Sequence, residues 1–251
     1  MFIETLGTGP SLVMIHGWAM HGGAVTSLVE GLRDRHTLHL GDRPGHGRSR
    51  DSTVPLALDA VAAHVAARLP PALWLGWSLG GLFAMNVAQK HPDGVRGLIM
   101  LAATPRFVRG EDWPQGIDPA LFDGFARRLE NDYRTTLDRF LMLEAQGSDH
   151  AREEIRLLRA IVYAHGEPPA AVLREGLGLL QHSDLRAGLP ALTMPTLWLA
   201  GRRDKLVSPA SMQASADATP QSRFERIEHG GHAPFLTHAD EVADAIAAFE
   251  T

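Results

Sequence analysis

The stretch LWLGWSLGGL, Leu73 to Leu82, decides how the rest of this sequence is interpreted. An apolar run passes into GWSLG (residues 76–80), and a helical pattern follows at once. This pentapeptide matches G-x-S-x-G, in which a serine stands on a sharp turn between a strand and a helix and small neighbours let the backbone pass closely. Two interpretations are open: a tight turn and nothing more, or Ser78 held up as a nucleophile.

A serine nucleophile needs a base, and the base needs an acid that orients it. In this kind of site the chain order is nucleophile, acid, histidine. Asp204 follows the apolar run 196–200, and His232 follows the run 222–227. Both therefore come after predicted strands, where a sheet presents catalytic groups. We expect Ser78, Asp204 and His232 to form a catalytic triad.

Other residues compete for these roles. A lone loop aspartate is by default a solvated turn residue, and His229 is the nearest rival to His232. His232 is preferred because two glycines precede it and an apolar stretch follows it. Asp42 follows an earlier strand, which is the wrong order, and no acid follows the run 97–102.

Acyl transfer also needs hydrogen-bond donors for the oxyanion. His16-Gly17-Trp18 follows the first core strand. The backbone amides of Trp18 and Leu79 are the candidate donors, and His16 is expected to order the loop.

Composition narrows the class of protein. The chain has 251 residues, 45% of them hydrophobic, which suits one sizeable core. A net charge of -5 gives no overall basic field for nucleic acid. There is no cysteine, and no histidine spacing typical of a metal site, so we expect neither metal nor cofactor. No signal peptide or membrane span is apparent, and we expect a cytoplasmic monomer with no membrane partner.

Apolar runs alternate with helical patterns along the chain, which predicts the α/β class. The runs are continuously apolar, so we expect strands buried on both faces in a mostly parallel central sheet flanked by helices. The predicted strands are 11–16, 37–40, 73–76, 97–102, 196–200 and 222–227, and the predicted helices are 54–69, 79–90 and 237–249. Residues 104–189 show helical patterns without a convincing strand. We expect a core of residues 1–103 and 190–251, and a helical lid insertion, 104–189, over the carboxyl edge of the sheet.

These features together resemble the α/β-hydrolase superfamily over nearly the whole chain. A closer resemblance is to the BioH family of carboxylesterases, and several matching stretches lie outside the catalytic motifs. The stretches are GWSLGGL (76–82), TLHL (37–40), DWP (112–114), DRFL (138–141), DLR (184–186) and HAPF (232–235). The resemblance implies an α/β-hydrolase fold, hydrolysis of the methyl ester of pimeloyl-[acyl-carrier protein] in biotin synthesis, and no cofactor.

The resemblance also implies substrate contacts. Trp18 and Leu79 would flank the ester at Ser78 and His232. The acyl channel would be lined by Phe140, Leu141, Met142, Leu143 and Glu144. From the residues alone, this stretch is equally the packing face of the insertion.

Arginines of the insertion would dock an acidic acyl-carrier protein. The resemblance places Arg139, Arg152 and Arg156 at matching positions, whereas one family arginine aligns with Thr135, beside Arg134. Spacing adds a fourth docking arginine, because Arg152, Arg156 and Arg159 form a stripe at i, i+4 and i+7 on one helix. Residues 127–159 hold seven arginines and seven acids, so a solvated helix with internal ion pairs is the alternative.

Two further classes of function stay open. A broad-specificity esterase, lactonase or carbon–carbon hydrolase would share the triad. A non-catalytic receptor on the same scaffold would bind a small molecule without turning it over. A dehalogenase is disfavoured, because that chemistry requires an aspartate where Ser78 stands.

Overall fold

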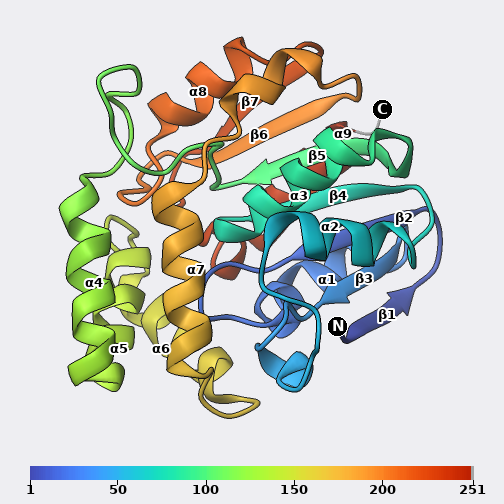
Figure 1. Ribbon diagram of the computed structural model, residues 1–251. Helices are drawn as coiled ribbons and strands as arrows, with labels where there is room; N and C mark the ends of the chain where they lie inside the picture. The colour runs from blue at the N-terminus through green and yellow to red at the C-terminus, as the bar shows by residue number, and fades with distance from the viewer. Residues whose placement is uncertain (250–251) are drawn as a thin grey trace.

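The computed structural model describes residues 1–249, apart from the side chain of Glu130, and is built around one twisted sheet (Figure 1). The sheet has seven strands in the order β1-β3-β2-β4-β5-β6-β7. Their bounds are β1 Ile3–Gly7, β2 Ser11–Ile15, β3 Thr37–Gly41, β4 Ala72–Trp77, β5 Val95–Leu101, β6 Thr196–Gly201 and β7 Ser222–Ile227. All neighbours pair in parallel except β1, which runs antiparallel to β3. The predicted mostly parallel sheet is confirmed.

Helices cover both faces of this sheet, which explains why β4 and β6 are buried at every residue. Helix α2 (Leu58–Ala66) packs against α3 (Leu79–Lys90) in front of the sheet in Figure 1. Helix α1 (Thr26–Leu32) packs against α9 (Ala239–Phe249) behind it, and α8 (Pro209–Asp217) lies along β6 and β7.

The six predicted strands are confirmed, and the differences lie at the edges. Strand β1 was not predicted, because it is a half-exposed edge strand without a continuous apolar run. The predicted helix 54–69 is shorter at both ends: α2 spans Leu58–Ala66, and the backbone of Ala57 before it is extended. Helix α3 matches its prediction at both ends. Helices α1 and α8 were missed.

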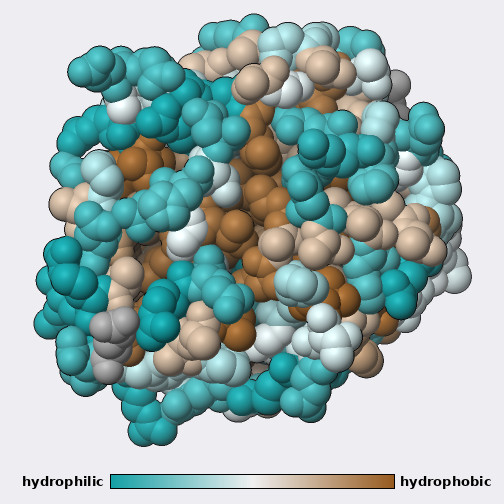
Figure 2. Space-filling model, in the orientation of Figure 1, coloured by the Kyte–Doolittle hydropathy of each residue, from teal (hydrophilic) through white to brown (hydrophobic). Residues whose placement is uncertain are grey.

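Four α-helices stand between β5 and β6 within the described residues. They are α4 (Pro119–Asn131), α5 (Tyr133–Glu144), α6 (Ala151–Tyr163) and α7 (Ala170–His182). Figure 1 shows them as a separate layer at the left, beyond the carboxyl ends of β4 and β5. Figure 2 shows apolar surface in the seam between these helices and the core. We call residues 104–189 the helical insertion.

Candidate active site

Ser78 stands at a strained turn between β4 and α3. Its φ is 53° and its ψ is -123°, a conformation that residues with a side chain rarely adopt. The glycines around Ser78 are required because other backbone atoms approach them too closely for a side chain to fit. A Cβ on Gly76 would collide with the backbone of Gly80 and Gly81, and a Cβ on Gly80 would collide with the carbonyl oxygen of Ile15. The strand-to-helix turn therefore needs glycine two residues before and two residues after Ser78, as the sequence has it.

The turn brings Ser78 together with a histidine and an aspartate. The Ser78 hydroxyl donates to His232 Nε2 at 2.8 Å, and His232 Nδ1 donates to Asp204 Oδ2 at 2.8 Å. The other carboxylate oxygen of Asp204 accepts from the amides of Leu206 at 2.7 Å and Val207 at 2.9 Å. All three side chains are buried. The carboxylate contact assigns the proton to Nδ1 and leaves Nε2 free to accept a proton from serine.

The competing residues lie elsewhere. His229 is exposed, and its ring contacts Arg203 rather than Ser78. Asp42 accepts from the amides of Gly22 and Arg48, so its carboxylate holds a loop together. The structure thus separates both rivals from the serine.

The backbone at His232 is held by an aromatic cluster. Trp77 Nε1 donates to the carbonyl oxygen of His232 at 2.9 Å, and the ring of Phe235 meets Trp77 edge-on at 4.8 Å between centroids. The apolar stretch after His232 therefore fixes the position of the imidazole.

Two backbone amides lie beside the serine turn. Leu79 is the first residue of α3, so its amide has no carbonyl partner one turn earlier, and the positive end of the helix dipole adds to it. Within residues 1–249, the Trp18 amide donates no hydrogen bond. The Trp18 side chain is buried under the insertion: Nε1 donates to the carbonyl of Leu173 in α7 at 2.8 Å, and the ring packs on Phe140 at 4.3 Å.

Helix α5 presents only part of the expected channel stretch to the interior. Phe140, Leu141 and Glu144 are fully buried, and Leu143 is half-buried. Met142 differs from these residues, because its side chain is 58% exposed, and its contact with substrate stays a prediction. The helical repeat places residues 140, 141 and 144 on one face, and residue 142 points to the opposite side.

Glu144 is a buried acid that the sequence did not single out as unusual. Neither of its carboxyl oxygens has a hydrogen-bond partner among the described residues. Burial, followed by the charges of Asp204 and Glu154, raises the pKa of Glu144 well above its ordinary range. The Glu144 carboxyl group therefore binds its proton more tightly than an exposed glutamate does, and the charge of Asp204 contributes to this.

The turn between α5 and α6 is tied to the loops that carry Asp204 and His232. Asp149 in this turn forms an ion pair with Arg203, next to Asp204. Glu154 of α6 accepts from Thr237 Oγ1 at 2.9 Å, shortly after His232. The insertion is therefore connected directly to the loops of Asp204 and His232.

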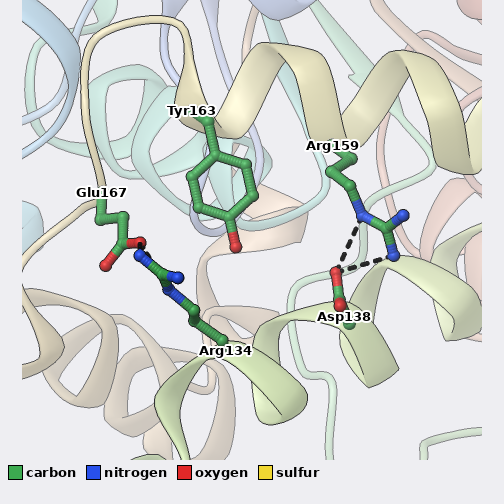
Figure 3. Close-up of a pocket in the computed structure, with 5 residues that line it drawn as sticks. All are labelled: Arg134, Asp138, Arg159, Tyr163 and Glu167. Atoms are coloured by element: carbon green, nitrogen blue, oxygen red, sulfur yellow. Dashed lines mark hydrogen bonds and ion pairs between the residues drawn. The ribbon is translucent and has the colours of Figure 1, made fainter.

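The predicted docking arginines divide into two groups. Arg139, Arg152 and Arg156 are exposed and form no ion pair with the described residues. Arg159 is held by Asp138 at 3.0 Å, and Figure 3 shows this pair on one side of Tyr163. On the other side of Tyr163, Arg134 is bound to Glu167, at 2.6 Å.

Thr135, the position of the remaining family arginine, is exposed, and its amide donates to the helix cap Asp132. No group of three or more histidine and acidic side chains in the described part of the chain could hold a metal ion. None of the described helices is long and apolar enough to cross a membrane.

Comparison with known proteins places this geometry in a class. The sequence model of the protein family described as alpha/beta hydrolase fold matches residues 10–239 of this chain. The esterase EaEST from Exiguobacterium antarcticum has a similar structure, with a TM-score of 0.88 at 22% sequence identity, covering 100% of this chain and 95% of that chain. At that identity the likeness shows the fold alone. Fold and family model together define an α/β hydrolase.

Relatives with similar sequences show which family of α/β hydrolases this chain belongs to. The pimeloyl-[acyl-carrier protein] methyl ester esterase of Stenotrophomonas maltophilia (strain K279a) is 56% identical, over 99% of this chain and 96% of that protein. The protein of the same name from Xanthomonas oryzae pv. oryzae (strain MAFF 311018) is 54% identical, over 99% of this chain and 98% of its own. The chain belongs to the pimeloyl-[acyl-carrier protein] methyl ester esterase family of α/β hydrolases.

Proposed function

We propose that this protein is a serine carboxylesterase that hydrolyses the methyl ester of pimeloyl-[acyl-carrier protein] to pimeloyl-[acyl-carrier protein] and methanol, acting in biotin synthesis as a cytoplasmic monomer. The observation that carries the proposal is the buried hydrogen-bonded chain Ser78–His232–Asp204 in a protein more than half identical to the esterases named above.

Acylation begins when Ser78 Oγ attacks the ester carbonyl carbon and His232 Nε2 takes the hydroxyl proton. The carbonyl oxygen becomes an oxyanion, which accepts hydrogen bonds from the amides of Trp18 and Leu79. Collapse of the tetrahedral intermediate breaks the bond to the methoxy oxygen, and His232 gives that oxygen its proton, so methanol leaves.

Deacylation repeats the sequence with water. His232 removes a proton from water as it attacks the acyl-serine, and then returns a proton to Ser78 Oγ. The products are the free carboxylate and the regenerated serine. Asp204 holds His232 in one tautomer and stabilises the imidazolium in both halves. Each step uses groups of this chain and water.

The helical insertion acts as a lid in this proposal. Ser78 is only 1% exposed, so a substrate reaches it only when the insertion moves relative to the core. Phe140 and Leu141 lie on the inner face of α5, beside Trp18, and supply apolar surface for a methylene chain. Leu143 borders the same face.

Carrier docking is assigned to the exposed arginines of α5 and α6. Arg139, Arg152 and Arg156 are free to form new ion pairs with an acidic partner. Arg159 would have to exchange Asp138 for a carboxylate of the carrier, so we assign it a smaller share.

The deciding measurement is kcat/KM on pimeloyl-[acyl-carrier protein] methyl ester and on free dimethyl pimelate, with Ser78→Ala as the control. A large preference for the carrier-bound ester, lost in the variant, is expected. Equal activity on both esters would reduce the function to a broad-specificity esterase. Binding of the esters without turnover by the unmodified protein would contradict an enzymatic role and favour a receptor.

A further inference from the structure

One peptide unit next to the serine turn receives three hydrogen bonds on its carbonyl oxygen, one of them from the backbone amide of Met20 at 3.3 Å and two from side chains. Arg43 Nη2 donates to the oxygen of Gly17 at 2.7 Å, and His16 Nδ1 donates to the same oxygen at 2.9 Å. This carbonyl belongs to the peptide bond between Gly17 and Trp18. Because a trans peptide is planar, its C=O and N–H point in opposite directions. Fixing the Gly17 oxygen therefore fixes the direction of the Trp18 N–H.

The state of His16 follows from its second nitrogen. His16 Nε2 accepts from the backbone amide of Arg43 at 3.0 Å, so the ring proton is on Nδ1, which faces the Gly17 oxygen. Burial, and then the charge of Arg43, lowers the pKa of His16 well below its ordinary value, which keeps the ring neutral. The imidazole thus links the loop of Arg43 to the Gly17–Trp18 peptide.

Arg43 is placed at a site that is unfavourable for a cation. Its side chain is fully buried, and both Nε and Nη1 have no hydrogen-bond partner among the described residues. Its guanidinium lies 5.3 Å from the ring centroid of Phe83. Burial lowers its pKa to about 9, so it remains charged near neutral pH. Burying a guanidinium with unpaired N–H groups is costly, and an apolar side chain would fill this space at lower cost.

We propose that Arg43 is a positioning residue for the oxyanion site, which acts by orienting and polarising the Gly17–Trp18 peptide. A charge-assisted hydrogen bond to the carbonyl increases the dipole of the whole peptide unit, and this strengthens the N–H as a donor. The inference rests on the proposed esterase chemistry, and it adds a role for a residue that never touches the substrate.

The test compares a methyl ester with its thionoester analogue, in which sulfur replaces the carbonyl oxygen. Sulfur is a weaker acceptor, so an effective oxyanion site favours the oxygen ester. We expect Arg43→Met to lower kcat on dimethyl pimelate by about 10-fold or more, with little change in KM, since each oxyanion donor contributes on the order of 100-fold. The rate ratio of oxygen ester to thionoester should fall with it.

Arg48→Met is the matched control. Arg48 lies in the same loop and bonds to Asp42 and Glu4, away from the Gly17 carbonyl. It should change stability without changing the oxygen-to-sulfur ratio. Arg43→Gln, which keeps an N–H donor without charge, serves as the second variant if the methionine variant does not fold, and its ratio should also fall.

The outcomes separate the two hypotheses. A folded Arg43 variant with an unchanged ratio would overturn the role of Arg43 while the esterase function stands. An unmodified protein that hydrolyses neither ester, carrier-bound or free, would overturn the function itself.

Discussion

Ser78 shows how one residue depends on its neighbours. Its positive φ is unfavourable for a residue with a side chain, and it persists because α3 packs closely on β4 at Gly76 and on β2 at Gly80. The G-x-S-x-G spacing is therefore a steric requirement that can be recognised in the sequence. The buried acid Glu144 is the opposite case, because nothing in its local sequence marks it as unusual.

Glu144 makes stability depend on pH. Its folded-state pKa is raised, so the folded protein holds the proton more tightly than the unfolded chain does. Stability is therefore complete below the unfolded pKa of about 4.3 and falls as pH rises toward the folded pKa, by about 1.4 kcal/mol per pH unit at most. Glu144→Gln removes this titration. The Tm difference between Glu144→Gln and the unmodified protein should grow as the pH rises above the unfolded pKa.

The control for this experiment is Glu153→Gln, which removes a carboxylate from an exposed position on α6 and corrects for net charge. If the Tm difference between Glu144→Gln and the unmodified protein stayed constant or shrank as the pH rose, the fold would not raise the pKa of Glu144.

At the scale of elements, the docking of α3 onto β2 is the contact that places Ser78. Gly80→Ala would put a methyl group against the carbonyl of Ile15, so the helix would have to move away from the strand. We expect a loss of about 3 kcal/mol or more in the free energy of unfolding, measured by urea denaturation. Gly178→Ala in α7 is the matched control.

Gly178 has open space where a Cβ would stand, so the same substitution should be neutral or stabilise the protein by up to about 1 kcal/mol. Similar losses at both glycines would mean that helix propensity, rather than the approach of α3 to β2, governs the effect.

The whole molecule adds a surface that no single element provides. Arg139 of α5 and Arg152 and Arg156 of α6 lie exposed on two helices joined by the turn at residues 145–150. Reversing the charge at Arg152 and Arg156 to glutamate should lower kcat/KM on the carrier-bound ester by about 10-fold or more at low salt and leave free dimethyl pimelate unaffected. The effect should diminish as ionic strength rises.

Arg33→Glu, at an exposed arginine after α1, is the control for net charge. This variant should leave the ratio of kcat/KM on the carrier-bound ester to kcat/KM on the free ester unchanged. Equal loss on both esters in the Arg152 and Arg156 variant would instead indicate damage to the insertion, because the α5–α6 turn contacts the loops of Asp204 and His232.

The amino-acid sequence by itself determined where the six parallel strands lie along the chain, the turn at Ser78, and the order of serine, aspartate and histidine. These features depend on steric fit and apolar periodicity within a few residues, so they are visible locally. Only the tertiary structure decided which arginines are engaged, that Met142 faces solvent, that Glu144 is buried near Asp204, and that Arg43 reaches Gly17. Each of these depends on how helices and loops distant in the chain pack together, because packing alone sets the partners and the burial of a charged side chain.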